Sequence, residues 1–177
     1  MRPIGIVSIL REQTPGPNRS FAYLMAAAGN NTGNLLFTNA IWEQIPGPKE
    51  RVGFAFDPEK VNSTMRALVF PAANWFGAHV DLADFADRVE QLDIPVVMIG
   101  LGAQDQDYRS HLAVPDGTLR FVRSVAERSK TISLRGHYTR EVLARYGIGN
   151  VTVTGCPSLY CSLQPDCSSR NLRKSVC

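Results

Sequence analysis

The stretch TISLRGHYTREVLARYGIGNVTVTGCPSLY, residues Thr131–Tyr160, holds one full alternation of strand, helix and strand. It begins with a short apolar segment, Thr131–Leu134, and a second such segment follows at Val151–Thr154. Between them, tyrosine, valine and tyrosine recur every fourth residue from Tyr138, a spacing that places all three on one face of a helix. Gly147 can adopt the left-handed conformation that ends such a helix. The stretch therefore predicts a β-α-β unit.

The rest of the chain repeats this alternation. Pro95–Gly100 is rich in β-branched residues, uncharged and apolar on both faces, which predicts a central strand covered by helices on both sides. Asp81–Leu92 and Thr118–Ser129 have the apolar period of amphipathic helices. Further strands are predicted at Pro3–Leu10, Arg51–Phe56 and Met65–Phe70, a helix at Leu35–Ile45, and either a strand or a short helix at Phe21–Ala28. The pattern predicts an α/β fold with a doubly wound, Rossmann-like parallel sheet of about six or seven strands.

Composition limits the classes of function. The chain has 177 residues, 44% of them hydrophobic and 20% charged, as is typical of one globular domain with a core. A net charge of +3 without a basic stripe argues against a nucleic-acid partner. No run approaches the roughly 18 apolar residues of a transmembrane segment. The four cysteines form no C-x-x-C pair, so we expect neither a metal site nor a disulfide framework, and a reducing, cytoplasmic compartment.

Polar side chains follow three of the predicted strands. Asn74 comes after Met65–Phe70, Gln104 after Pro95–Gly100, and Arg135 after the first strand of the β-α-β unit. The carboxyl ends of parallel strands form the edge of a ligand crevice. Arginine matches a carboxylate or phosphate with two parallel hydrogen bonds, although a salt bridge to a neighbouring acid would also explain Arg135. Asn74 and Gln104 are either hydrogen-bonding groups for a sugar or phosphate, or ordinary loop residues.

The loop GNNTGN, residues 29–34, precedes the predicted helix Leu35–Ile45. A helix starting near Asn34 would direct free backbone N–H groups at whatever the loop faces, which suits a phosphate or carboxylate. Asn31, Gly33 and Asn34 are therefore candidate binding residues. The alternative is a plain turn with an asparagine cap.

No arrangement of a nucleophile with a base stands out, and no catalytic residue is assigned. His79 and His137 are each either proton shuttles or solvated surface residues, and Cys156 suits a small buried position better than a nucleophile. The motif G-L-G at Gly100–Gly102 lacks the third glycine of a dinucleotide site, because Asp105 stands in its place. A nicotinamide cofactor is therefore not expected.

Three blocks of the sequence resemble the polysaccharide pyruvyl transferase family. They are GNNTGNLLFTNAIWEQI (Gly29–Ile45), IPVVMIGLGAQ (Ile94–Gln104) and SLRGHYTREVLARYGIGNVTVTGCPSLY (Ser133–Tyr160), in the order that the family has them. The resemblance implies a reaction that takes phosphoenolpyruvate and a pair of glycan hydroxyls, forms a pyruvate ketal and releases phosphate, in exopolysaccharide or cell-wall polysaccharide biosynthesis. It implies no cofactor. Family members carry a similar N-x-G-N segment near the cleft, which favours a binding role for the loop at residues 29–34.

The family is similar in fold to two-domain glycosyltransferases of the GT-B kind, in which two Rossmann-like halves face a cleft. The resemblance thus implies that residues 1–160 are an N-terminal Rossmann-like domain. Residues 161–177 hold four serines, three cysteines and three basic residues without an apolar period, which predicts a disordered or truncated tail. Such a half would show little activity alone and would expose an interdomain face for self-association. Two alternatives stay open: a fragment of a GT-B glycosyltransferase that uses a nucleotide sugar, and a non-catalytic binding domain.

Overall fold

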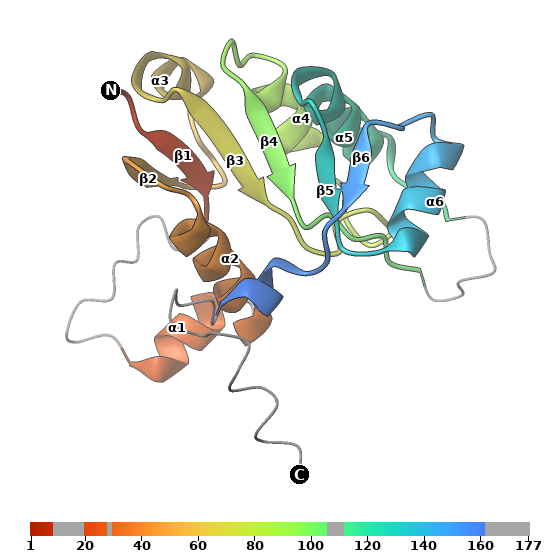
Figure 1. Ribbon diagram of the computed structural model, residues 1–177, viewed down its shortest axis with the longest axis horizontal. Helices are drawn as coiled ribbons and strands as arrows, with labels where there is room; N and C mark the ends of the chain where they lie inside the picture. The colour runs from red at the N-terminus through yellow and green to blue at the C-terminus, as the bar shows by residue number, and fades with distance from the viewer. Residues whose placement is uncertain (9–19, 28–29, 106–111, 162–177) are drawn as a thin grey trace, which may run out of the picture.

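Parallel strands form the centre of the molecule (Figure 1). The computed structural model describes residues 1–8, 20–27, 30–105 and 112–161. The strands are β1 (Ile4–Val7), β2 (Lys49–Val52), β3 (Ala67–Pro71), β4 (Val96–Ile99), β5 (Ile132–Leu134) and β6 (Val151–Val153). They pair in the orders β2-β1-β3-β4 and β5-β6, parallel throughout. The backbone N–H groups of Gly100 and Leu101 donate to the Ser133 carbonyl, which joins the two groups at the ends of β4 and β5. The predicted parallel α/β sheet is confirmed.

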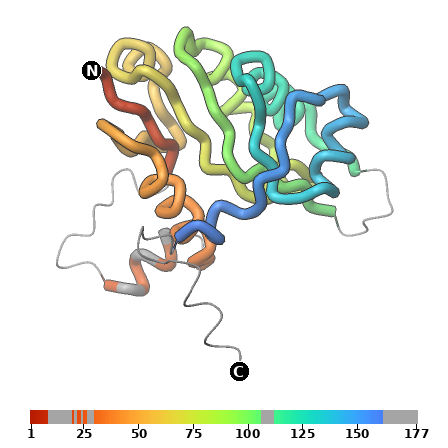
Figure 2. The backbone as a smooth tube through the Cα atoms, viewed as in Figure 1, coloured from red at the N-terminus to blue at the C-terminus, as the bar shows by residue number. Residues whose placement is uncertain are grey.

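Helices lie on both faces of the sheet, but they cover it unequally. They are α1 (Phe21–Ala27), α2 (Thr32–Gln44), α3 (Pro58–Thr64), α4 (Ala83–Val89), α5 (Asp116–Arg128), α6 (His137–Arg145) and the 3-10 turn η1 (Pro157–Tyr160). Figure 1 shows α4 and α5 behind the sheet, and α2 near the arrowheads of the strands. Figure 2 follows the chain from β6 past the lower ends of the strands to η1, which packs against α2. The carboxyl ends of the strands therefore face α2 and η1.

The main core lies between the sheet and the helices α3–α6. Alternate residues of the strands point into it, and Leu68, Phe70, Val96 and Met98 have no exposed surface. The ring of Phe121 on α5 meets Phe70 edge to face, with centroids 5.2 Å apart. Burying each such side chain contributes about 1.5–3 kcal/mol, so this layer provides most of the stability of the fold. It also gives the carboxyl edge a rigid base.

The direction of winding reverses between β1 and β3. The chain leaves β1, passes through α2 and returns as β2 on one side, and the next crossover through α3 brings β3 to the other side. Ile6 of β1 and Val69 of β3 are register partners across this point. In open α/β sheets, a ligand crevice forms at such a switch point, outside the carboxyl ends of the two strands. The topology thus selects the ends of β1 and β3 as the place to look for a site.

The burial predicted for the central strand is wrong on one face. β4 does lie between β3 and β5, but the side chain of Val97 is 37% exposed. A second, smaller core cluster lies on this face of the sheet and explains the difference. Residues of α2 pack there against Ile6, Val69 and Ile99, but not against Val97. Hydroxyl groups pair with one another on the neighbouring strands β5 and β6 and on the residues that flank them. Thr131 pairs with Thr152 at 2.9 Å, and Ser133 pairs with Thr154 at 2.5 Å.

Several element boundaries differ from the prediction. The helix predicted at Leu35–Ile45 begins at Thr32, because the side chain of Asn31 caps it. The strand predicted at Arg51–Phe56 lies earlier, at Lys49–Val52, and the undecided segment Phe21–Ala28 is helical as α1. The predicted tail lies outside the described residues from residue 162 onward.

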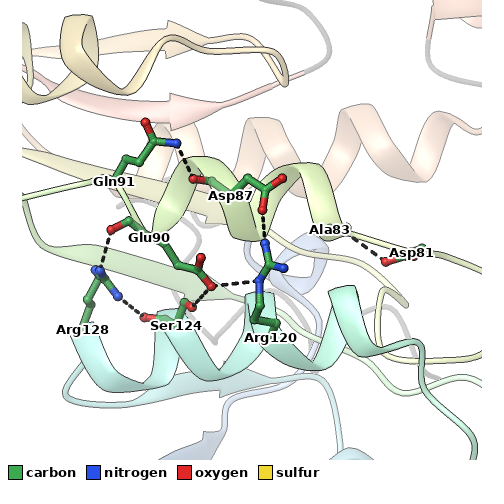
Figure 3. Close-up of polar contacts among 8 residues, drawn as sticks. All are labelled: Asp81, Ala83, Asp87, Glu90, Gln91, Arg120, Ser124 and Arg128. Carbon is green, nitrogen blue, oxygen red and sulfur yellow. Dashed lines mark hydrogen bonds and ion pairs between the residues drawn. The ribbon is translucent and has the colours of Figure 1, made fainter.

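The two helices α4 and α5 are held together by charged side chains (Figure 3). Arg120 of α5 forms ion pairs with Asp87 and with Glu90, the latter at 2.9 Å. Arg128 donates to the backbone carbonyls of Ser124 and Glu90. These groups are largely solvent-exposed, so water and salt screen the ion pairs. Their role is to align the two helices rather than to supply much stability.

Candidate anion site and cavity at the carboxyl edge

A cavity of about 270 Å³ opens at the switch point. Val7 and Ser8 at the end of β1 and Pro71 at the end of β3 form its base. Its other lining residues come from the first turns of α2, from the loops that follow β2 and β3, and from α4: Asn34, Phe37, Thr38, Phe54, Trp75, Val80, Leu82 and Phe85. The position agrees with the general rule for open sheets. Among the residues proposed from the sequence, Asn34 lies in this lining.

Arg135 follows β5 at the same edge and is half-buried. Its Nε–H donates to the carbonyl of Gly100 at 3.0 Å, and its guanidinium carbon lies 5.3 Å from the ring centroid of Phe37. Phe37 also lines the cavity, so the two features adjoin. The stacked ring and the carbonyl fix the direction of the guanidinium group. Part of its donor capacity remains for another group.

Within the described residues, no acidic side chain forms an ion pair with Arg135. Other arginines are satisfied differently: Arg120 is paired with carboxylates, and Arg123 donates to the carbonyl of Tyr146. The salt bridge that the sequence left open for Arg135 is therefore not formed with any described residue. A half-buried cation without a counter-charge suits an anionic ligand.

Gly102 brings Asn74 and Arg135 together. It is buried in the segment after β4, where its N–H donates to Ala73 and its carbonyl accepts from Phe76. A Cβ atom at this position would overlap the Asn74 amide oxygen and lie 3.3 Å from Cδ of Arg135. The Asn74 side chain therefore approaches the backbone more closely than a Cβ atom would allow, and the Arg135 side chain lies in tight contact beside it. The binding role predicted for these two residues stays a prediction.

Cys156 lies on the other side of Arg135, in the turn after β6. Its thiol is 3.0 Å from the Ser158 hydroxyl. Burial alone would raise the pKa of this thiol, but hydrogen bonds from the Ser158 side chain and backbone and the charge of Arg135 outweigh burial and lower the pKa. The positive field of Arg135 thus acts on a second group at this edge.

The loop before α2 serves as a helix cap. The side-chain oxygen of Asn31 accepts from the N–H of Gly33 at 2.9 Å, and its carbonyl accepts from the N–H of Asn34 at 3.1 Å. The cap therefore occupies the N–H groups of Gly33 and Asn34, and the binding role predicted for this loop stays a prediction. Asn31 and Gly33 are exposed, whereas Asn34 is half-buried.

The remaining candidates lie apart from Arg135. Gln104 is exposed, and its backbone N–H pairs with the carbonyl of Phe76. His137 is the first residue of α6, and both His137 and His79 are exposed. No hydrogen bond joins these three side chains to Asn74 or Arg135 in the described part of the chain. The structure places Asn74 and Arg135 around Gly102 and Asn34 in the lining of the adjoining cavity, and Gln104 belongs to neither group.

A comparison with protein-family models decides the family. The model for polysaccharide pyruvyl transferase matches residues 31–174, a span that includes α2, the Gly102 segment, Arg135 and Cys156. The chain belongs to the polysaccharide pyruvyl transferase family. No curated protein and no solved structure matches the chain.

Sequence reasoning missed several residues that shape this pyruvyl transferase edge. The sequence predicts only an amphipathic helix around Phe37, the apolar face of a helix at Phe85, and a strand at Phe54, whereas all three line the cavity. Gly102 appeared only as part of a rejected dinucleotide motif. The one available signal was the pair of glycines directly after the most apolar strand, which marks a close approach of backbone and side chains.

Three further observations concern metal ligands, membrane-spanning helices and cysteines in the described part of this family member. In the described ranges, no cluster of three or more histidine, cysteine, aspartate or glutamate side chains could hold a metal ion. None of the helices described there has the length and apolar character needed to cross a bilayer. The two described cysteines, Cys156 and Cys161, are free thiols.

Proposed function

We propose that this member of the polysaccharide pyruvyl transferase family binds phosphoenolpyruvate at the carboxyl edge of its sheet, for transfer of the pyruvyl group to a glycan. The observation that carries the proposal is Arg135, a half-buried guanidinium group without a carboxylate partner among the described residues. Phosphoenolpyruvate carries a carboxylate and a phosphate, and either one matches the planar donors of arginine.

The reaction joins two hydroxyl oxygens of the glycan to C2 of the enolpyruvyl group and breaks its bond to the phosphate oxygen. One hydroxyl proton ends on the methylene carbon, which becomes a methyl group, and the other leaves with phosphate. Arg135 would stabilise the negative charge of the donor in the ground state and as phosphate departs. Asn74, whose amide oxygen lies against Gly102, would offer its amide group to the same ligand. We assign no general acid or base.

We further propose that the chain supplies one Rossmann-like half of a two-sided cleft, as in the GT-B arrangement. The resemblance supports this proposal, and such a half would expose an interdomain face for self-association. Catalysis across a cleft needs groups from both sides and exclusion of water. The 177-residue chain alone should therefore give little phosphate release with phosphoenolpyruvate and glycan acceptors. Rapid turnover would contradict the half-site arrangement. A cytoplasmic location, with access to phosphoenolpyruvate, completes the proposal.

Ligand choice tests the proposed donor against the glycosyltransferase alternative. Phosphorus NMR of phosphoenolpyruvate and of UDP-glucose, each titrated with the protein, reports which phosphate is bound through line broadening. We expect broadening of the phosphoenolpyruvate resonance, and we expect an excess of the analogue phospholactate to reverse it by competing for the same site. Broadening of UDP-glucose alone would refute the proposed donor and favour a nucleotide-sugar transferase.

A further inference from the structure

We propose that the cavity at the switch point is a subsite for one pyranose ring of the glycan acceptor, stacked on an aromatic wall of Phe54, Trp75 and Phe85. This inference deepens the proposed function and rests on it for the identity of the acceptor as a glycan. The cavity adjoins Arg135 through Phe37, which has the guanidinium group over its ring and also lines the cavity. Donor and acceptor would thus lie on neighbouring parts of one edge.

The cavity lining and Arg135 differ in charge, so they suit different ligands. None of the described residues that line the cavity is charged, whereas Arg135 beside it carries an unpaired positive charge. An anion would lose its hydration in the cavity without gaining a counter-charge, so the cavity suits a neutral ligand. Its volume of about 270 Å³ is at the small end of ligand pockets, which fits a single sugar ring rather than a chain of rings.

The aromatic wall has the arrangement that a sugar face requires. Trp75 and Phe85 are stacked, with an interplanar angle of 21° and centroids 6.1 Å apart, and Phe54 meets Phe85 edge to face at 5.6 Å. Phe54 is 42% exposed although it is large and apolar. One face of a pyranose ring presents C–H bonds, which pack on the electron-rich face of an aromatic ring. An exposed ring beside a neutral cavity is the surface such a C–H face would cover.

The wall is held rigid from behind. Phe85 lies 5.6 Å from Phe70 and 5.5 Å from Phe121, measured between ring centroids, and both of these core rings are fully buried. Trp75 also reaches Phe121, at 6.4 Å. A ligand that stacks on this wall therefore spends little of its binding energy on ordering side chains.

Polar groups stand on other parts of the lining. Thr38 supplies a hydroxyl group from the first turns of α2, beside Ser8 and Asn34, which have partners of their own. A pyranose ring carries hydroxyl groups around its edge, so it needs polar partners at the rim of an apolar platform. This combination of an apolar wall and a few polar groups is typical of small-molecule sites, and here it matches the two-sided character of a sugar.

Saturation-transfer difference NMR with a panel of methyl pyranosides tests the subsite directly. The panel consists of the methyl glycosides of glucose, galactose, mannose and N-acetylglucosamine, and phosphoenolpyruvate is left out. We expect signals from the ring C–H protons of at least one glycoside with the parent protein. Phe54→Ala should weaken binding of that glycoside roughly threefold to tenfold, the usual worth of an aromatic contact. Because Phe54 is partly exposed, this variant should keep its fold, which its melting temperature verifies.

Two control variants separate the subsite from other effects. Tyr160→Ala removes an aromatic ring of equal exposure, 41%, on η1 and should leave the sugar signals unchanged. Arg135→Gln should weaken phosphoenolpyruvate binding about tenfold to a hundredfold but keep the sugar signals. The inference is overturned if no glycoside gives ring signals, or if Phe54→Ala and Tyr160→Ala behave alike. Sugar binding without phosphoenolpyruvate binding would overturn the proposed donor and leave the sugar subsite standing.

Discussion

Replacing Gly102 by alanine should disturb the anion site from within the backbone. The added Cβ atom would overlap the Asn74 amide oxygen, and it would lie 3.3 Å from Cδ of Arg135 and 3.5 Å from the carbonyl oxygen of Ala73. The backbone at Gly102 cannot easily retreat, because its N–H and carbonyl are both hydrogen-bonded, at 2.8 Å and 3.1 Å. The side chains of Asn74 and Arg135 must therefore move.

The size of the effect follows from these contacts. Overpacking of a buried position costs about 1–3 kcal/mol of the free energy of unfolding. Displacing Arg135 removes a charged hydrogen bond to the ligand, worth about 1.5–3 kcal/mol, so affinity for phosphoenolpyruvate should fall about tenfold to a hundredfold. Urea denaturation measures the first quantity and calorimetric titration the second.

A matched glycine and a compensating change make the test specific. Gly136→Ala places its Cβ where no atom lies within 4 Å, so it should change neither quantity appreciably. Combining Gly102→Ala with Asn74→Ala removes the worst overlap and should restore part of the lost stability, a coupling that a double-mutant cycle detects. If Gly102→Ala retains full stability and full affinity, the close approach at Gly102 is not what shapes the site.

Three further predictions concern single residues. The charge of Arg135 helps to lower the pKa of Cys156, so the Cys156 thiolate forms at a lower pH than the thiolate of a free cysteine. Arg135→Gln should therefore shift the pH midpoint of Cys156 alkylation upward, and an unchanged midpoint in peptide mass spectrometry would contradict this. Val97→Thr should change the free energy of unfolding by less than about 0.5 kcal/mol, whereas Met98→Thr should cost about 2–4 kcal/mol, and equal costs in urea denaturation would contradict the open face. Asn31→Ala should cost about 1 kcal/mol through loss of the α2 cap, and an unchanged melting temperature would speak against that cap.

Local periodicity in the sequence is enough to predict most of the fold. The β-α-β unit at the end of the chain was predictable because Tyr138, Val142 and Tyr146 follow the helical period, and Gly147 ends the helix with a positive φ of 76°. The exposure of Val97 was not predictable, because it depends on which tertiary elements cover each face. An apolar strand looks the same in sequence whether one or both of its faces are covered.

The site was only partly predictable for a similar reason. Arg135 and Asn74 follow strands, so strand order alone places them at one edge. The cavity beside them is assembled from α2, α4, the ends of β1 and β3 and the loops after β2 and β3, and no sequence period relates Phe54 to Phe85. The capping role of Asn31 was recognised as the alternative to a binding role, and the hydrogen-bond geometry favours the cap.

Calorimetric titration of phosphoenolpyruvate into the parent protein, Arg135→Gln and Arg120→Gln tests the central claim most directly. Arg120 is the matched control, because it is also an arginine but already has Asp87 and Glu90 as partners. We predict that Arg135→Gln weakens binding about tenfold to a hundredfold and that Arg120→Gln leaves it unchanged. Equal affinity of the parent and Arg135→Gln, or an equal loss in both variants, would contradict the assignment of Arg135 as the anion-binding residue.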